Sequence, residues 1–224
     1  MKLLSAQPTL AERVHRAILT EIAEGRLASG ERIVQERLAA ELGVSRQPVQ
    51  QALALLKNQR ILLEAPGRGL LVAPIDLDHV RQMSDLRAVI EGLAARRSAE
   101  HASDAALRQG PALIRAGRQA AGRGLIGAMI AADVAVHNAI YQWSGNDLIA
   151  PTLETHWTMM QRVMGEVLAR DETPHDIWDQ HEALLDAIAA GDADRADALA
   201  REHILQAAQF MLTRLAGASD PSGR

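Results

Sequence analysis

The second half of this 224-residue chain carries four side chains that can bind a metal ion: Asp133, His137, His181 and His203. Asp133 and His137 are one helical turn apart, and the apolar residues around them follow the same three-to-four-residue spacing. His181 and His203 lie in two further stripes of this kind, and each stripe must face the interior of a helical domain. One carboxylate and three imidazoles on three facing helices would form a cage for a divalent cation.

Each of these residues also has a simpler interpretation. A single histidine on an apolar face is more often a core residue that is hydrogen-bonded to a carbonyl. An aspartate and a histidine four residues apart are also a common ion pair on a helix surface. The pattern favours metal binding because all four side chains face inward in one helical region. Zinc and nickel suit this donor set best, and manganese is a further option.

The cluster requires helices, and residues 75 to 224 are predicted to be entirely helical. Apolar periodicity and loop-forming residues predict six helices, at about 77–101, 104–121, 124–144, 147–169, 174–190 and 192–216. Breaks are expected at Ser103, Gly122–Gly124, Ser144–Asn146, Thr173–Pro174 and Gly191–Asp192. The expected N-caps are Asp76, Ser103, Asn146 and Asp192. Residues 217–224 are expected to fray.

Composition supports a helical protein of one or two domains. Hydrophobic residues make up 48% of the chain but aromatic residues only 2%, and alanine and leucine dominate, which favours helices over sheets. The chain has no cysteine, so disulfides and thiolate ligands are excluded. No apolar run is long enough for a membrane span, and the N-terminus lacks the core of a signal peptide. We therefore expect a cytoplasmic protein with no membrane partner.

Charge is distributed unevenly along the chain. Residues 1–75 carry ten Lys/Arg against seven Asp/Glu, whereas the remainder carries fourteen against twenty-one. The overall net charge of −4 therefore hides a basic N-terminal part and an acidic C-terminal part. This asymmetry predicts two modules with different partners.

The basic part has the pattern of a winged helix-turn-helix. Helices are predicted at about 9–25, 34–42 and 45–58, with Thr9 and Ser45 as N-caps and a turn over 27–32. The turn at Gly43 joins the second and third helices, and the third would present its N-terminal residues to a DNA major groove. Apolar runs at 61–63 and 70–72 flank a Pro/Gly turn and predict a β-hairpin with Arg68 at its tip.

This part resembles the GntR family of bacterial transcription regulators. The resemblance covers residues 9–74 and rests on the stretch Leu38-Ala-Ala-Glu-Leu-Gly-Val-Ser-Arg-Gln-Pro-Val-Gln-Gln-Ala-Leu53, on Gly25-Arg-Leu27 and Gly30-Glu31 before it, and on Pro66-Gly-Arg-Gly69 after it. It implies that double-stranded DNA is contacted by Ser45, Arg46 and Gln47 at the start of the recognition helix and by Arg68 and Gly69 in the wing. Arg46 is expected to read a guanine edge and Ser45 to contact a phosphate. Arg37 is a further candidate DNA contact.

One position departs from the family pattern. Family members commonly have Val-Arg-Glu-Ala-Leu where this chain has Val49-Gln-Gln-Ala-Leu53, so Gln50 replaces an arginine that contacts DNA. Glutamine can read adenine but cannot neutralise a phosphate. We therefore expect an altered operator sequence or a weaker salt dependence.

The acidic part, over about residues 78–215, resembles the FadR-type (FCD) C-terminal ligand-binding domain of GntR regulators. The resemblance rests on Arg87-Ala-Val-Ile-Glu91, Asp133-x-x-x-His137, Ser144-Gly-Asn146, the segment from His181 to Ile188, Asp192 and His203. It implies that Asp133, His137, His181 and His203 are metal ligands. Six helices rather than seven indicate the VanR-like group. We expect a DNA-binding domain at 1–74 and a metal-binding, effector-binding and dimerisation domain at 75–224.

The chemistry of such a site predicts an acidic effector. A divalent cation with one carboxylate and three neutral imidazoles has a net charge near +1, which attracts an anion in a buried site. A five- or six-coordinate metal keeps positions open for a carboxylate. Arg87, on the first helix of the domain, would clamp that carboxylate, and Arg162 is a second candidate unless it faces solvent. We expect Trp143, Trp157 and Trp178 to be core or dimer contacts.

These observations lead to a preferred function and two alternatives. The preferred function is a homodimeric transcription regulator whose operator binding is controlled by a small organic acid. The first alternative is a metal-dependent hydrolase or oxygenase. The position of Glu182 argues against it, because this residue directly follows His181 and points away from the ligands. The second alternative is a metal ion that only stiffens the helical domain.

Overall fold

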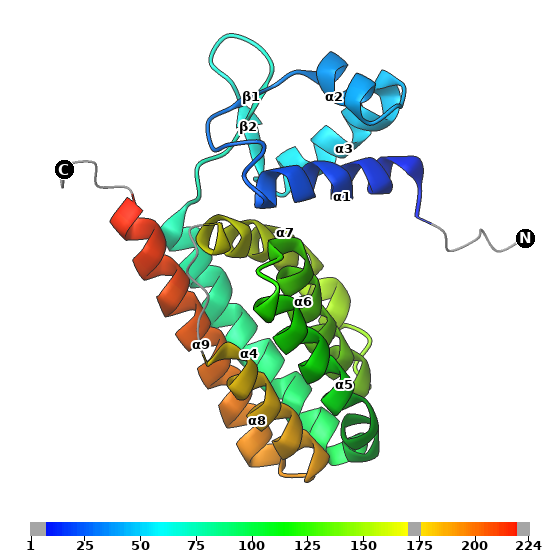
Figure 1. The fold of residues 1–224 in the computed structure, drawn as a ribbon, viewed down its shortest axis with the longest axis vertical. Helices are drawn as coiled ribbons and strands as arrows, with labels where there is room; N and C mark the ends of the chain where they lie inside the picture. The colour runs from blue at the N-terminus through cyan, green and yellow to red at the C-terminus, as the bar shows by residue number, and fades with distance from the viewer. Residues whose placement is uncertain (1–7, 170–175, 219–224) are drawn as a thin grey trace, which may run out of the picture. The chain divides into compact units, whose positions relative to one another are not determined.

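The computed structural model describes residues 8–169 and 176–218, which are mainly helical. The chain divides into two compact units between Ile75 and Asp76. The described residues of the first unit form helices α1 to α3 and a three-stranded sheet, and those of the second form helices α4 to α9 (Figure 1). Within the described ranges, no helix combines the length and apolar character that crossing a membrane requires.

Helix α1 (Leu10–Ala23) begins as its sequence predicts. The Thr9 hydroxyl accepts a hydrogen bond from the Glu12 backbone amide, and the Glu12 carboxylate accepts one from the Thr9 amide. This capping box satisfies two amides that the first helical turn leaves without partners. The apolar face of α1 packs against α3, so the two helices share one core.

Helices α2 (Gln35–Glu41) and α3 (Arg46–Asn58) form the predicted helix-turn-helix. Gly43, in the turn, has a φ of 65°, a conformation that favours glycine. Ser45 occupies the N-cap position of α3, but its side chain makes no capping hydrogen bond. Its hydroxyl is therefore available for a contact outside the protein.

The hairpin of strands β2 (Leu62–Glu64) and β3 (Leu70–Val72) is antiparallel, with Leu63 opposite Leu71. Strand β1 (Arg32–Ile33) adds to the other edge of β3 and gives the order β1-β3-β2. The sequence predicted only a turn over 27–32, so β1 is a correction. A two-residue strand is too short to show periodicity in the sequence. It forms because the edge of β3 that faces away from β2 has backbone groups available for pairing. The Val72 amide, for example, donates a hydrogen bond to the Glu31 carbonyl.

The second unit consists, over residues 76–169 and 176–218, of the six predicted helices. They are α4 (Leu77–His101), α5 (Ser103–Gly122), α6 (Ile126–Trp143), α7 (Ile149–Leu168), α8 (Ile177–Ala189) and α9 (Ala193–Ala218). Helix α4 contacts each of the other five and packs most extensively along α9. The predicted break at Thr173–Pro174 and most of the predicted frayed end lie outside the described residues.

Two of the four predicted N-caps in this unit are confirmed. Asp76 accepts hydrogen bonds from the amides of Asp78 and His79, and Asp192 accepts one from the amide of Arg195. The other two predictions are wrong. Ser103 is the first residue of α5 rather than its cap, and α7 begins three residues after Asn146, whose side chain accepts from the Leu148 amide.

Candidate metal centre

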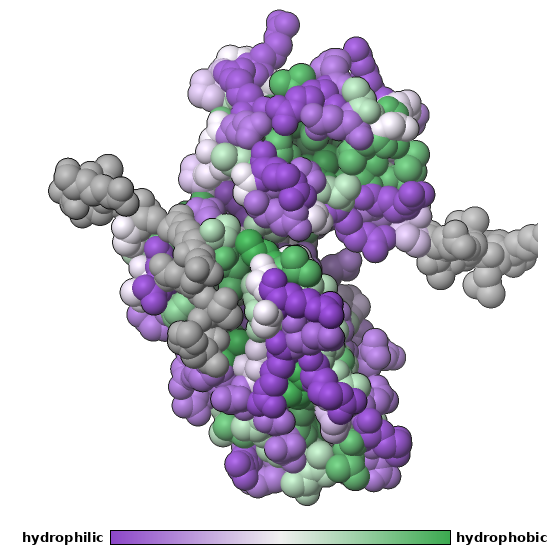
Figure 2. All heavy atoms as spheres, viewed as in Figure 1, coloured by the Kyte–Doolittle hydropathy of each residue, from purple (hydrophilic) through white to green (hydrophobic). Residues whose placement is uncertain are grey.

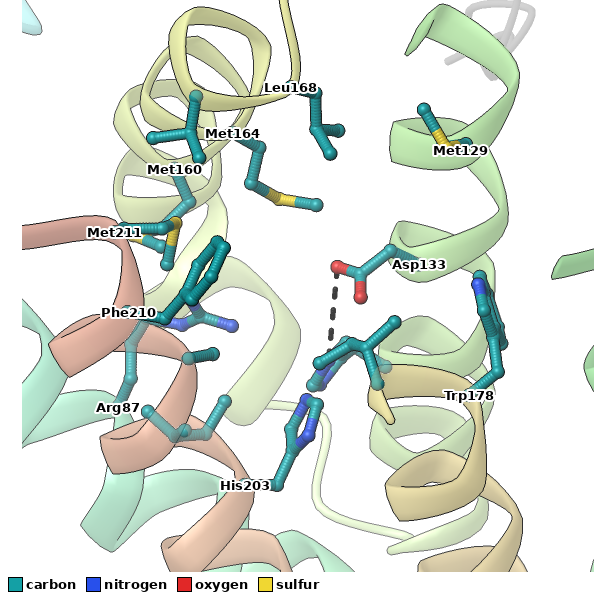
Figure 3. A pocket seen from close by; sticks show the side chains of 15 residues that line it. Arg87, Met129, Asp133, Met160, Met164, Leu168, Trp178, His203, Phe210 and Met211 are labelled. Carbon is teal, nitrogen blue, oxygen red and sulfur yellow. Dashed lines mark ion pairs between the residues drawn. The ribbon is translucent and has the colours of Figure 1, made fainter. Parts of the chain in front are cut away.

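Three helices of the second unit bring the four predicted metal-binding side chains together. Asp133 and His137 come from α6, His181 from α8 and His203 from α9, and all four are buried. Each offers one ligand atom, and these four atoms lie within 4.8 Å of one another. Figure 3 shows Asp133 and His203 directed into the same cavity from opposite walls.

The nitrogen and oxygen atoms of the cluster face one another at short range. Asp133 Oδ1 lies 3.3 Å from His181 Nε2, and Asp133 Oδ2 lies 3.9 Å from His137 Nε2. The Nε2 atoms of His137 and His181 are 3.4 Å apart. At this separation one Nε2 atom can donate a proton to the other, or both lone pairs can face a cation. With the Asp133 carboxylate beside them, the cluster can accommodate a positively charged occupant.

Residues outside the cluster fix the orientation of two of its imidazoles. His137 Nδ1 bonds the carboxylate of Glu91, and His203 Nδ1 lies 3.0 Å from the side-chain oxygen of Gln180. In each ring the Nδ1 atom is engaged, which leaves Nε2 as the metal-binding nitrogen. Such outer partners commonly orient metal-binding histidines, so this donor set fits a divalent cation.

Burial and charge set the protonation of the histidines. Burial, assisted by the nearby His137, lowers the pKa of His181 to about 3. Burial also holds the pKa of His203 well below its usual value. His137 differs, because the Glu91 carboxylate outweighs the effect of burial and raises the pKa of this imidazole. His181 and His203 are therefore neutral near pH 7, which is the form that binds metal.

Arg87 lies beside the cluster in a buried network that the sequence only partly predicted. Its Nε and Nη2 atoms lie 2.8 and 2.7 Å from Glu91 Oε1, and its guanidinium carbon lies 4.4 Å from the centre of the Trp157 ring. Burial favours a neutral Glu91, but the charges of Arg87 and His137 outweigh it and hold the Glu91 pKa well below its usual value. Glu91 was not among the site residues predicted from the sequence. It lies four residues after Arg87, a spacing that favours an ion pair on one helix face.

A cavity of about 740 Å³, counted with its opening to solvent, adjoins the cluster and is lined mainly by apolar side chains. Arg87, Asp133, His137 and His203 contribute its charged or ionisable groups. The remaining lining residues are Met129, Met160, Met164, Val167, Leu168, Ile177, Trp178, Ile204, Ala207, Phe210 and Met211. Figure 3 shows these side chains surrounding a common space.

Arg162 and Trp178 depart from their sequence-based interpretations. Arg162 is buried on α7, and burial lowers its pKa, so it does not face solvent. It does not line the cavity either, so the geometry gives no support for its predicted effector role. Trp143, Trp157 and Trp178 are all buried, as expected of core residues. Trp178 also forms part of the cavity wall, and the centre of its ring lies 4.9 Å from the centre of the His181 ring.

The predicted DNA-contacting residues are all exposed on the first unit. These are Arg37, Ser45, Arg46, Gln47, Gln50, Arg68 and Gly69. Arg46 Nη1 lies 3.2 Å from Glu36, and Arg37 Nε lies 2.9 Å from Glu41. Arg32, which was not predicted as a functional residue, donates hydrogen bonds to the carbonyls of Arg68 and Pro66 and so holds the wing.

Both units match known families of bacterial regulators. Residues 10–72 match the gntR family of bacterial regulatory proteins, and residues 82–206 match the FCD domain. The transcriptional repressor RspR of Escherichia coli is 24% identical over 86% of this chain and 85% of its own length. A probable D-xylose utilization operon repressor of Paenarthrobacter nicotinovorans is 26% identical over 88% of this chain and 86% of its own.

Solved structures show the same fold. The match with McbR/YncC of E. coli has a TM-score of 0.79 at 22% identity and covers 92% of this chain and 99% of the McbR chain. A GntR regulator from Rhodococcus sp. RHA1 has a TM-score of 0.74 at 20% identity, with coverages of 91% and 97%.

The comparisons also bear on the alternative of a hydrolase or oxygenase. The matched families and the relatives are transcriptional regulators and not enzymes. Glu182, which follows His181, lies on the outer surface and pairs with Arg118 at 2.7 Å. The enzyme alternative is therefore not supported. The chain belongs to the gntR family of bacterial regulatory proteins and is a DNA-binding transcriptional regulator with a C-terminal FCD domain.

Proposed function

We propose that a small carboxylate effector, bound at a divalent-metal site in the FCD domain, controls how this regulator binds its operator. The observation that carries the proposal is the cluster of four metal-binding side chains, three of which line one cavity together with a buried arginine. Asp133, His137, His181 and His203 would hold the metal ion. A divalent cation with open coordination positions would supply a Lewis-acid contact for a carboxylate oxygen. Zinc and nickel are the preferred metals, and manganese is possible.

Arg87 would bind the second part of the carboxylate. Glu91 and Trp157 hold its guanidinium in place, so little side-chain entropy is lost when a ligand arrives. Glu91 also compensates for the buried positive charge of Arg87 when the cavity contains no anion. Arg162 is not part of this proposal because it does not line the cavity.

At the operator, the exposed residues of the first unit would divide into base and phosphate contacts. We assign Arg46 to a guanine edge, Gln47 and Gln50 to other base edges, and Ser45 to a phosphate. Arg68 and Gly69 would contact DNA through the wing, and Arg37 would reach the backbone. Arg46 would exchange its contact with Glu36 for the base. Because the operator lies on the chromosome, we place the protein in the cytoplasm.

A homodimer is supported by an apolar stripe on α4. Leu86, Val89 and Leu93 are 57%, 55% and 43% exposed and follow helical spacing. A second copy of the chain would cover this stripe, which a monomer leaves in water. The opposite face of α4 carries Arg87 and Glu91. The helix also begins only two residues after Ile75, the last residue of the first unit. A shift of α4 on effector binding would therefore reach both the dimer contact and the DNA-binding unit.

The test is a titration of the purified protein onto the DNA upstream of its own gene, followed by fluorescence anisotropy. We expect sequence-selective binding at moderate salt, and release or strengthening by carboxylates only when zinc or nickel is present. His203→Ala should abolish the response to carboxylates and keep DNA binding. If His203→Ala lowers the melting temperature but leaves the carboxylate response intact, the metal is structural and the proposed control is wrong.

A further inference from the structure

We infer that the effector is a monocarboxylate with an apolar tail, either an alkyl chain of about six to eight carbons or one aromatic ring, and not a di- or tricarboxylate. This inference rests on the proposed carboxylate site and specifies the class of molecule that fits it. It is carried by the polarity, net charge and length of the cavity.

Polarity changes along each helix that contributes a metal-binding side chain. On α6, Met129 lies one turn from Asp133, and on α8, Ile177 lies one turn from His181. On α9, Phe210 and Met211 lie about two turns beyond His203. Figure 3 shows Met129, Met164 and Leu168 on the side of Asp133 that is away from His203. The cavity therefore has one polar end and one apolar end.

Helix α7 forms a wall that contributes only apolar side chains to the lining: Met160, Met164, Val167 and Leu168. These residues follow one helical stripe over about 12 Å. A second carboxylate directed at this wall would lose its hydration, because α7 contributes no cation to the lining. Methionine side chains adapt to different shapes, so the wall can accept either an alkyl or an aromatic tail.

The charges around the cavity fit an anion with a single charge. A divalent cation with the Asp133 carboxylate and neutral imidazoles carries a net +1, and the adjacent Arg87–Glu91 pair adds nothing. Among the described residues, Arg87 is the one lysine or arginine that lines the cavity. A monocarboxylate neutralises the site, whereas a dicarboxylate leaves a net negative charge in an apolar enclosure.

The length of the apolar part limits the tail. Phe210 is seven residues from His203, which corresponds to about 10.5 Å along α9. An extended chain advances about 1.2 Å per bond, so about eight bonds span this distance. One phenyl ring on a short linker would fit the same space.

The experiment measures the affinity of the zinc-loaded, full-length protein for a series of acids by isothermal titration calorimetry. The acids are acetate, butanoate, hexanoate, octanoate, dodecanoate, 3-phenylpropanoate, malonate and citrate. We expect about a fourfold gain for each methylene buried, up to octanoate, with no further gain for dodecanoate. Malonate and citrate should bind more weakly than hexanoate. The acids that bind most tightly should also change DNA affinity at the lowest concentrations.

Two variants test the assigned tail site. Met164→Gln and Leu168→Gln place an amide at half-buried positions of the apolar wall, so folding should be retained. Each should weaken octanoate binding about tenfold and leave acetate and zinc binding unchanged. Leu205→Gln is the matched control, because Leu205 is 46% exposed on α9 and does not line the cavity.

The outcomes separate this inference from the proposed function. If citrate or malonate binds more tightly than octanoate, and Met164→Gln has no effect on octanoate, the inferred class is wrong while the carboxylate site stands. If no acid in the series binds the zinc-loaded protein, the carboxylate site itself is wrong. If octanoate binds equally well with and without zinc and to the His203→Ala variant, its carboxylate lies elsewhere and the inference also fails.

Discussion

Glu91 gives the candidate metal centre a feature that the four donors alone do not have. Its carboxylate contacts both His137 and Arg87, so one buried anion orients a metal-binding imidazole and a carboxylate-binding guanidinium. A buried carboxylate is costly unless it is paired, and here the Arg87 guanidinium and the His137 imidazole both pair with it. The geometry of the metal and the effector contacts therefore depends on the same residue.

Glu91→Gln tests this dependence at the residue scale. Glutamine can keep a hydrogen bond to His137 but removes the charge that increases its basicity and fixes Arg87. We expect zinc affinity to fall about 10- to 100-fold in a competition assay with a chromophoric chelator. Glu182→Gln is the control, because Glu182 is next to His181 in sequence but pairs with Arg118 on the surface. Equal zinc affinities for the two variants would contradict the assigned role of Glu91.

The pKa values of the histidines predict that the metal-free protein loses stability in mild acid. His181 and His203 are buried and neutral, with folded-state pKa values below that of the unfolded chain. The unfolded chain therefore binds more protons, and the free energy of unfolding falls as pH drops below about 6.5. His137, whose pKa is raised, works in the opposite direction and gains stability in acid.

The expected net loss from His181 and His203 is about 1 to 3 kcal/mol for each pH unit below 6. Urea unfolding of the metal-free protein between pH 7 and 5 measures it. His203→Gln should reduce the slope by about half, because one of the two proton-binding sites of the unfolded chain is removed. A slope that is unchanged by His203→Gln would assign the acid sensitivity to other groups.

At the scale of elements, α5 packs closely against α8 and supports Trp178, which lines the cavity. A Cβ atom at Gly117 of α5 would overlap the indole ring of Trp178, whereas a Cβ atom at Gly110 would lie 3.6 Å from Leu185, an ordinary contact. We expect Gly117→Ala to cost about 1–3 kcal/mol and to displace Trp178, which quenches or shifts its fluorescence. Gly110→Ala is the matched control, and it should be neutral or stabilise by up to about 1 kcal/mol. Equal melting temperatures for both variants would contradict this packing.

Elements were more predictable from the sequence than the contacts between them. Apolar periodicity predicted the six helices of the second unit because each buries one face along its whole length. The same periodicity placed Asp133, His137, His181 and His203 on inward faces, which the structure brings together. Strand β1 and the contact between Glu91 and His137 depend on tertiary neighbours rather than on local pattern. Trp178 was predicted to be buried, but its place in the cavity wall was not predicted. Arg162 is buried, but it does not line the cavity that its predicted effector role requires.

At the scale of the whole molecule, the proposed regulation requires two copies of the chain. A palindromic operator binds a dimer far more tightly than a monomer, because both recognition helices contact DNA at once. The exposed stripe of Leu86, Val89 and Leu93 lies on α4, which also carries Arg87 on its buried face. Contacts across the stripe would therefore change if effector binding at Arg87 shifts α4.

Val89→Glu tests this arrangement by placing a charge at the middle of the stripe. Val89 is 55% exposed, so the substitution should leave the monomer folded, whereas a buried carboxylate would separate the dimer. We expect a monomer in sedimentation velocity and a loss of affinity for the full operator of about 100-fold. Affinity for a single half-site should not change, because the recognition helix is untouched. Leu107→Glu, at a residue on α5 that is 65% exposed, is the control. If the Val89→Glu protein remains dimeric, the dimer contact lies on another face. In that case α4 does not connect effector binding to the dimer contact, and the proposed arrangement is wrong.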